Sequence, residues 1–502
     1  MPGIESETEQ LVIQVPKLND FNSPVVVTDR KQVEQWLEDL PVLNLSRVLS
    51  QLIDAVEPMV VNPLDATLRM QLLELYRRSA IGLYPSANKE NLRALPIDVR
   101  QRKQAASDTG TLCMHLANGY KRVVADAYRE SQQMLKQPLM LIATQRALEM
   151  LALAVLHAYR SYSSLPGFIW LEIHQLYGLA ERQQAVETPV PGTSKQATIG
   201  YLYRRLMLLS IADPFHMAEG VAFQTYKQLG QIIHLCQIEN RPASKTGEYM
   251  IDLLGDSPPL PVNRCKPDSV IDAPRTLNIS GLQQFAAQQE YTELQQSSRP
   301  EDIPLRLFHP DVTNNRTRQN ERQPANHRIN ICFGLSELCK LLGDVDVGPD
   351  LHQWRIQNTS TSGIAVKSAH DTPLDLYIGD LVGIEHTDEP HNDDSPVQAA
   401  QIRWMRQDDN GYTEMGLEYL TGELQVVRCR LADDDPLNSR DYYGLHMETA
   451  DQSELILPKG AYRRGRILSM QLQGVLLSIE AGFLKMDTLN FDRFSYKALA
   501  PL

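Results

Sequence analysis

The chain lacks an excess of basic residues and closely spaced cysteines, and each absence excludes a class of protein. Its 502 residues include 49 Lys and Arg against 62 Asp and Glu, which gives a formal net charge of −13 at pH 7. General nucleic-acid-binding proteins usually present a basic face, so we expect no nucleic-acid partner. The six cysteines are scattered without a CxxC pair. Reduced thiols in a cytosolic protein are therefore expected, rather than a disulfide framework or a zinc site.

Long hydrophobic runs and a secretory signal are also missing. The first residues, MPGIESETEQ, are acidic and contain no apolar core segment. The longest apolar runs, such as Ala152–Ala158, are far shorter than the roughly 20 residues that a membrane-spanning helix needs. We therefore expect a cytoplasmic protein without a membrane span.

Motifs of the common enzyme classes are absent as well. There is no Walker A sequence, no HExxH, no GxSxG and no Rossmann fingerprint. The histidines of the first half do not form ligand pairs at i, i+4. A denser group of His, Asp and Glu between residues 386 and 394 has the composition of a hydrated loop. The sequence therefore predicts no enzyme, no metal site and no cofactor.

What the first half does contain is helical periodicity. Apolar residues recur at three- and four-residue spacing from residue 31 to 85, and Thr28 and Asp29 stand where a helix N-cap is expected. Amphipathic segments continue to about residue 238, followed by a short strand-like piece and one more helix. This pattern predicts an irregular helical bundle over residues 31–296. A helix-pair repeat array is the alternative, but we find no second copy of the suggestive spacing at Trp170 and Tyr177.

The periodicity changes to alternation after about residue 328. Short β-branched runs follow one another between turns, among them RINICFG, WRIQNTS, GIAVKSA, AAQIRWMRQ and LQVVRCRL. Strands at this spacing are typical of a small barrel or sandwich, which we place at residues 328–435. A helical stretch at 336–342 interrupts it, and an additional small β unit is expected at 436–502. Residues 1–30 read as a flexible or extended N-terminus, and 297–327 as an exposed connection rich in arginine.

A cluster of basic side chains is the most distinctive feature of this connection. Arg318 and Arg322 stand four residues apart, and Arg316, His327 and Arg328 lie close by in NNRTRQNERQPANHR. Arginine presents a planar fork of donors that fits a phosphate or a guanine edge, and it stacks on flat rings. In a chain of negative net charge, such a cluster is what could bind a small anion.

A second polar motif follows at the end of a strand-like run, where Asn358-Thr-Ser360-Thr-Ser-Gly363 leads into a turn. Short side chains of this kind offer hydrogen bonds beside exposed backbone N–H groups. Either motif alone is weak, because an arginine-rich linker is usually a solvated tether and NTSTSG is usually a plain turn.

Together and in order, these motifs resemble a PilZ domain, the bacterial receptor module for cyclic di-GMP. RxxxR corresponds to Arg318–Arg322 and [D/N]xSxxG to Asn358–Gly363. A looser signature follows in the family's order: a Gly379-Asp380 turn, the run from Arg403 to Arg406, and Gly416-Leu417-Glu418. The resemblance covers about residues 316–430 and implies an antiparallel β-barrel of PilZ type.

The resemblance also implies a role for each motif residue. Arg318 and Arg322 would bind the phosphates and guanine Hoogsteen edges of cyclic di-GMP. Asn358 and Ser360 would hydrogen-bond to a guanine, and Gly363 would allow a close backbone approach and a tight turn.

Two further arginines are candidates for the same site. The stretch Gln323-Pro-Ala-Asn326 stands between the second arginine of the motif and the first strand, so Arg316 or Arg328 could supply one of the contacts instead.

The expected function is that of a cyclic di-GMP receptor in bacterial second-messenger signalling. Ligand binding would order the arginine-containing connection, and the helical region would pass the signal to a protein partner. The alternative is a non-enzymatic interaction scaffold whose PilZ-like barrel no longer binds nucleotide.

Overall fold

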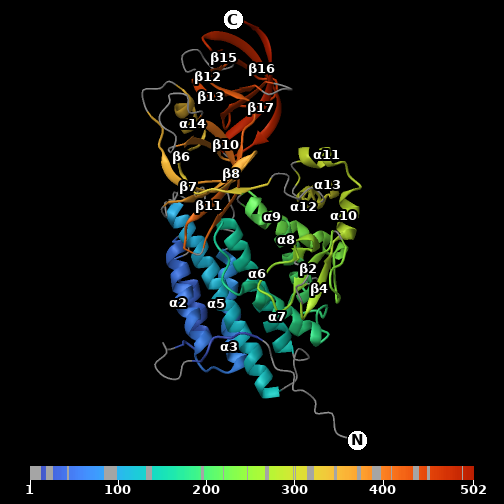
Figure 1. The fold of residues 1–502 in the computed structure, drawn as a ribbon. Coiled ribbons are helices and arrows are strands. Elements are labelled where there is room, and N and C mark those ends of the chain that lie inside the picture. The colour runs from blue at the N-terminus through green and yellow to red at the C-terminus, as the bar shows by residue number, and fades with distance from the viewer. Residues whose placement is uncertain are drawn as a thin grey trace. The chain divides into compact units, whose positions relative to one another are not determined.

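The chain forms two compact units, Met1–Thr317 and Arg318–Leu502. The computed structural model describes most of the chain, with gaps mainly in connections. The residues described are 13–18, 26–41, 44–83, 99–131, 138–193, 197–218, 220–245, 247–265, 271–297, 299, 301–313, 321–343, 348–369, 375–386, 397–408, 410–432, 440–448, 453–488 and 490–501. The first unit is mainly helical and the second is mainly β (Figure 1), as the sequence pattern predicts.

The helices of the first unit pack around a central antiparallel pair, α5 and α6 (Figure 1). Helices α2 and α3 contact α5, whereas α7, α8 and α9 contact α6. The helices are α1 (Arg30–Glu38), α2 (Leu45–Val61), α3 (Ala66–Leu83), α5 (Val99–Ser131), α6 (Pro138–Ser161), α7 (Ile169–Arg182), α8 (Ile199–Ile211) and α9 (Val221–Ile232).

Two of the predicted helix starts are confirmed by the local structure. The carboxylate of Asp29 accepts hydrogen bonds from the backbone N–H groups of Lys31 and Gln32 and so caps α1. Pro138 is the first residue of α6, where its missing N–H would have no helical partner.

Helix α6 has the length and hydropathy to cross a membrane, which the search for long apolar runs does not detect. However, 78% of its apolar stretch is buried inside the unit. The core helix of a soluble protein has the same composition, so the expectation of no membrane span stays a prediction.

A small four-stranded sheet, of order β1-β4-β2-β3, completes the first unit with four short helices. The sequence pattern predicts only the strand near residue 275, because the other strands are too short to show alternation. Helix α12 also corrects the expectation of an exposed connection from 297 onwards, since its Phe308 is fully buried. These elements are β1 (Gln237–Glu239), β2 (Tyr249–Asp252), β3 (Leu260–Pro261), β4 (Pro274–Asn278), α10 (Ser280–Ala286), α11 (Tyr291–Gln296), α12 (Asp302–Phe308) and α13 (Pro310–Thr313).

The second unit begins with an antiparallel sheet of order β5-β7-β6-β9-β10-β11-β8. An additional pairing of β7 with β8 closes this sheet on itself, which gives the predicted barrel. Helix α14 (Leu335–Leu342), the predicted helical insert, lies against β6 and β9. The strands are β5 (Gln323–Pro324), β6 (Arg328–Phe333), β7 (His352–Ser360), β8 (Gly363–Ser368), β9 (Leu381–His386), β10 (Gln398–Gln407) and β11 (Thr413–Tyr419).

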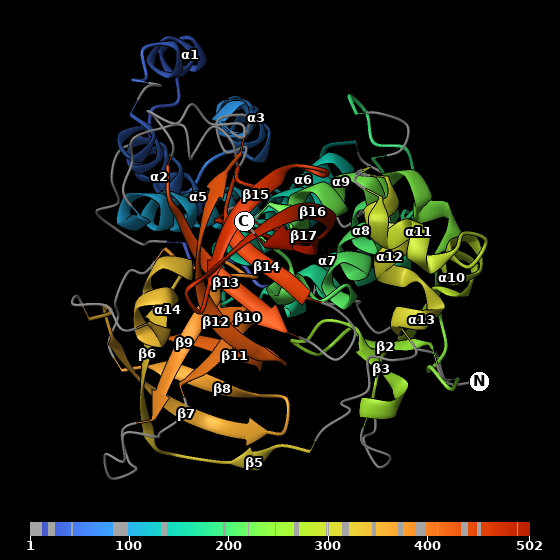
Figure 2. The same ribbon diagram turned by 90° about the horizontal axis from the view of Figure 1, so that it is seen from above.

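The rest of the second unit is a separate closed barrel of order β12-β13-β14-β17-β16-β15 (Figure 2), here called the C-terminal barrel. The sequence pattern groups the residues of β12 with the first barrel, but β12 pairs with β13 and β15. The strands are β12 (Glu423–Leu431), β13 (Tyr442–Glu448), β14 (Ser453–Pro458), β15 (Ile467–Leu472), β16 (Val475–Asp487) and β17 (Phe491–Pro501).

The two barrels share a hydrophobic core. Leu338 of α14 is packed in one cluster with Leu445, Ile456 and Phe491 of the C-terminal barrel, all four side chains being almost completely buried. The α14 insert therefore contributes to the contact between the two barrels.

Candidate ligand-binding site

The Asn-Ser motif forms the end of the β7–β8 hairpin. Asn358 lies opposite Ala365 and Ser360 lies opposite Gly363 in the antiparallel register. The Ser360 hydroxyl donates a hydrogen bond to the Gly363 carbonyl oxygen at 3.0 Å. Both motif side chains are half-buried and stand on the same face of the sheet, because residues two apart along a strand point to the same side.

The glycine of this motif is required by strand packing. A Cβ atom on Gly363 would lie 2.0 Å from the Leu417 carbonyl oxygen of β11, a distance that no side chain can occupy. The close approach that Gly363 permits in the structure is thus between β8 and β11. Its presence in the motif has a reason independent of any ligand.

The arginine-containing segment is held against the same strand. Gln323 pairs with Thr359 and Pro324 with Asn358, so β5 lies along the end of β7 (Figure 2). The Ala325 N–H donates to the Gln357 carbonyl oxygen at 3.1 Å and extends this pairing. Continuing the antiparallel register by one residue puts Arg322 opposite Ser360.

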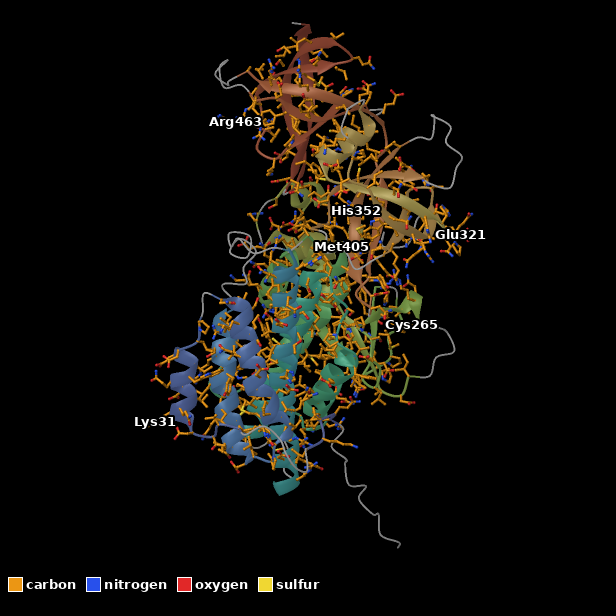
Figure 3. The ribbon with its side chains drawn as sticks, turned by 90° about the vertical axis from the view of Figure 1, so that its left-hand side faces the viewer. Lys31, Cys265, Glu321, His352, Met405 and Arg463 are labelled. Atoms are coloured by element: carbon orange, nitrogen blue, oxygen red, sulfur yellow. The ribbon has the colours of Figure 1, made fainter. Side chains whose placement is uncertain are left out.

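Arg322 is exposed, as is its neighbour Glu321, which Figure 3 labels at the surface of the sheet. Arg316 and Arg318 lie outside the described residues. The structure therefore brings Arg322 next to the Asn-Ser motif and leaves the position of the first motif arginine as a prediction.

A row of three cations crosses the same face of the sheet. Arg328 of β6 lies opposite Arg355 of β7, and Arg355 lies opposite Lys367 of β8. Lys367 forms an ion pair with Asp408. Sequence reasoning proposes Arg328 but not Arg355, because only the strand register shows that Arg355 stands between two other cations.

The third sequence signature lies in line with Asn358. In the cross-strand row Asn358–Ala365–Gly416–Trp404, each residue is opposite the next. A Cβ atom on Gly416 would lie 1.8 Å from the Trp404 indole nitrogen, so the ring lies directly over this glycine. This contact explains physically why tryptophan on one strand occurs with glycine on the next.

The charged residues of this signature form ion pairs on the barrel surface. Arg403 pairs with Glu418 at 2.9 Å, and both side chains are exposed. Arg406 pairs with the buried carboxylate of Glu414 at 2.8 Å. Burial raises the pKa of Glu414, but hydrogen bonds from Gln357 and Arg406 and the nearby positive charges lower it more, so the net pKa is below its ordinary value.

The Gly379-Asp380 turn links the first barrel to the C-terminal one. Gly379 has a φ of 96°, which favours glycine. The carboxylate of Asp380 accepts a hydrogen bond from the Tyr377 N–H at 2.9 Å and another from the Asn490 side chain at 2.8 Å. Asn490 precedes β17, so this turn is fixed by the neighbouring barrel.

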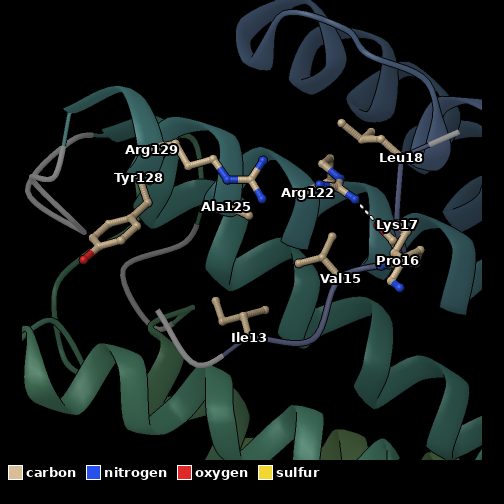
Figure 4. Close-up of a pocket in the computed structure, with 9 residues that line it drawn as sticks. All are labelled: Ile13, Val15, Pro16, Lys17, Leu18, Arg122, Ala125, Tyr128 and Arg129. Carbon is tan, nitrogen blue, oxygen red and sulfur yellow. Dashed lines mark hydrogen bonds between the residues drawn. The ribbon is translucent and has the colours of Figure 1, made fainter. Parts of the chain in front are cut away.

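A separate cavity of about 490 Å³ lies in the first unit (Figure 4). Its wall includes the segment from Ile13 to Leu18 and part of α5, and Arg122 donates a hydrogen bond to the Pro16 carbonyl oxygen. None of the predicted site residues lines this cavity. It is therefore distinct from the motif-bearing face of the second unit.

Two different family models match the helical unit and the β unit of this chain. Residues 344–425 match the family described as "Cyclic-di-GMP receptor FimW, middle PilZ domain". The second unit contains a PilZ domain. The matched residues include the Asn-Ser motif but not the arginine segment, which only the β5–β7 pairing brings to that motif.

The helical region also has relatives, although its sequence alone indicates no named domain. Residues 31–243 match "Cyclic-di-GMP receptor FimW, N-terminal domain". The cyclic-di-GMP receptor FimW of Pseudomonas aeruginosa is 22% identical to this chain over 596 aligned positions, which cover 99% of this chain and 95% of the relative. The chain is thus similar to a PilZ-type receptor over nearly its whole length.

Proposed function

We propose that this chain is a receptor for cyclic di-GMP, bound on the outer face of the PilZ sheet. The observation that carries the proposal is the pairing of β5 with β7, which lays Arg322 beside Asn358 and Ser360. Similarity to a protein named as a cyclic-di-GMP receptor supports the same ligand.

The chemistry of the face suits a dianion with two flat bases. Arg322 supplies a guanidinium fork for a phosphate or a guanine edge, and Asn358 supplies both a donor and an acceptor for the base. Arg328 and Arg355 face each other across two strands, an arrangement that normally destabilises a sheet. Both guanidinium groups stand on the motif-bearing face, where each can pair with a phosphate, so we include both in the proposed site.

The proposed output is a change in how the two units are connected. The boundary between the units falls at Thr317 and Arg318, at the first arginine of RxxxR. A ligand that holds both Arg318 and Arg322 would fix the connection to β7, and the helical unit would present the changed state to a protein partner. The protein would act in the cytoplasm as a binding protein, without catalysis.

Isothermal titration of the full chain with cyclic di-GMP tests the proposal. A charge-assisted hydrogen bond contributes about 1.5–3 kcal/mol, so Arg322→Ala should weaken binding roughly ten- to a hundredfold. Asn358→Ala should weaken it less, because a neutral hydrogen bond contributes only about 1 kcal/mol.

Arg440→Ala provides the matched control, because Arg440 is an exposed arginine of the C-terminal barrel. It should bind like the unchanged protein. No heat with the unchanged protein, while circular dichroism shows a folded β unit, would reject the receptor and favour an interaction scaffold.

A further inference from the structure

The C-terminal barrel carries a concentration of exposed apolar side chains that nucleotide binding does not explain. In the described part of the chain, twelve large apolar residues are exposed, and six of them belong to this barrel. None lies in the PilZ sheet between residues 321 and 420. The six are Tyr443, Val475, Leu476, Phe483, Leu484 and Leu499.

Phe483 stands out because its surroundings are basic. Its side chain is 62% exposed, the largest fraction among these residues. The guanidinium carbon of Arg464 lies 4.3 Å from the centre of the Phe483 ring, within the range of a cation–π contact. Arg463, labelled in Figure 3, precedes Arg464 in the loop, Lys485 follows Phe483 by two residues on β16, and both side chains are exposed. We call Arg463, Arg464, Phe483 and Lys485 the basic–aromatic surface.

The backbone beneath this surface is held firmly in place. The Gly465 N–H donates to the Ala481 carbonyl oxygen at 2.8 Å, and the Ala481 N–H donates to the Arg466 carbonyl oxygen at 2.9 Å. The hydroxyl of Tyr462 donates to the Gly482 carbonyl oxygen at 3.0 Å. The loop that carries the two arginines is thus fixed to β16 before any partner binds, which lowers the entropy cost of binding.

The cations of this surface are available to a partner. Among the described residues, no carboxylate forms an ion pair with Arg463, Arg464 or Lys485. Lys459, a few residues earlier in the same loop, is by contrast bound to Asp492 at 2.7 Å. Arg464 lies against the exposed ring, and Arg463 and Lys485 are exposed cations close to it in sequence, in a chain whose net charge is −13.

We propose that the basic–aromatic surface docks an acidic segment of a partner protein that places an apolar side chain against Phe483. Charge complementarity selects the occupant, because arginine forks pair with carboxylates and the exposed ring supplies an apolar anchor. Electrostatic attachment to anionic lipid usually takes clusters of roughly four to eight basic residues. The surface has three, which favours a protein segment over a membrane.

Fluorescence anisotropy with the full chain tests this surface without any nucleotide, so its result is independent of the receptor proposal. The probe is a short labelled peptide rich in Glu and Leu, and the matching peptide rich in Lys and Leu is the comparison. We expect the acidic peptide to bind, and binding to weaken as salt is raised, because exposed charges are screened. Arg464→Ala and Phe483→Ser should each weaken binding about tenfold, whereas Arg440→Ala should leave it unchanged.

Four results would each overturn the proposal. The first is failure of the acidic peptide to bind, and the second is peptide binding that neither variant weakens. Another is that vesicles containing phosphatidylglycerol, and not the peptide, bind the chain through Phe483, which would assign the surface to lipid. The last is a dimer, seen by light scattering, that Phe483→Ser dissociates, which would assign it to a second copy of the chain.

Discussion

The two barrels of the second unit differ in what they expose. The PilZ sheet presents ion pairs, short polar side chains and a row of cations, and none of its described large apolar residues is exposed. The C-terminal barrel has a similar antiparallel construction but exposes phenyl and leucyl side chains among arginines. A polar face with arginine forks suits a small anion, whereas an exposed apolar anchor suits a macromolecule.

Although the two barrels expose different side chains, they share part of their hydrophobic core. Leu338, Ile456 and Phe491 belong to one core cluster, and Asn490 is hydrogen-bonded to Asp380 across the two barrels. The two barrels are therefore joined both by apolar packing and by a hydrogen bond. We infer that the two barrels unfold together, although their surfaces differ.

The largest expected effect comes from breaking the shared core. Phe491 is 1% exposed, so Phe491→Ala should destabilise the unit by about 3–5 kcal/mol. Hydrogen exchange should show lost protection in β6 and β9 as well as in β14 and β17, because α14 packs on both barrels.

Phe483→Ala is the matched control, since it removes the same ring from the surface. It should change the stability by no more than about 0.5 kcal/mol. Loss of protection confined to the C-terminal barrel in Phe491→Ala would show that the two barrels are independent.

The next prediction tests whether Gly363 of the PilZ motif is needed for the stability of the fold, apart from any role in ligand binding. Gly363→Ala places a Cβ atom against the Leu417 carbonyl oxygen and should cost about 3 kcal/mol, because a backbone atom cannot easily move aside. Urea unfolding followed by tryptophan fluorescence measures it.

Gly348→Ala serves as the control, because a Cβ atom there meets no neighbour within 4 Å. Normal stability of Gly363→Ala combined with weakened nucleotide binding would instead indicate that this glycine contacts the ligand.

The smallest effect concerns acid sensitivity of the PilZ face. The pKa of Glu414 is lowered from 4.5 in the folded state, so its ionised form contributes stability above the unfolded pKa. That contribution is lost as the pH falls through the lowered folded pKa. Glu414→Gln should cost about 1 kcal/mol or less at pH 7, because Arg406 is partly exposed, and the cost should be smaller at pH 3.

Glu418→Gln removes an exposed ion pair with Arg403 and should change stability by less than about 0.5 kcal/mol at either pH. Urea midpoints at the two pH values measure both variants. An equal cost of Glu414→Gln at pH 7 and pH 3 would contradict the assignment of the effect to its charge.

Strand positions are largely predictable from this sequence, since alternation reports directly on which face is buried. The runs RINICFG and WRIQNTS correspond to β6 and β7, and the insert near 336 corresponds to α14. Strand β13 is not apparent, because Gly444 weakens its β pattern. Gly444 is nevertheless required there, as a Cβ atom would lie 2.2 Å from the Ile456 carbonyl oxygen.

The site is less predictable than the strands. RxxxR and NxSxxG indicate which residues to examine, and the order of the motifs indicates a PilZ domain. Their spacing does not indicate that Pro324 pairs with Asn358 or that Arg355 stands between Arg328 and Lys367. Register depends on neighbouring strands and on the bulge between Ile356 and Asn358, which are long-range properties.

The sequence by itself determined the local features of this protein: helices, most strands, the motifs and a negative net charge. Each depends on residues close together in the chain. Only the tertiary structure decided that β12 belongs to a second barrel, that the barrels share a core, and that Arg464 lies over Phe483. These features depend on contacts between distant residues, whose pairing is fixed by packing of the whole unit.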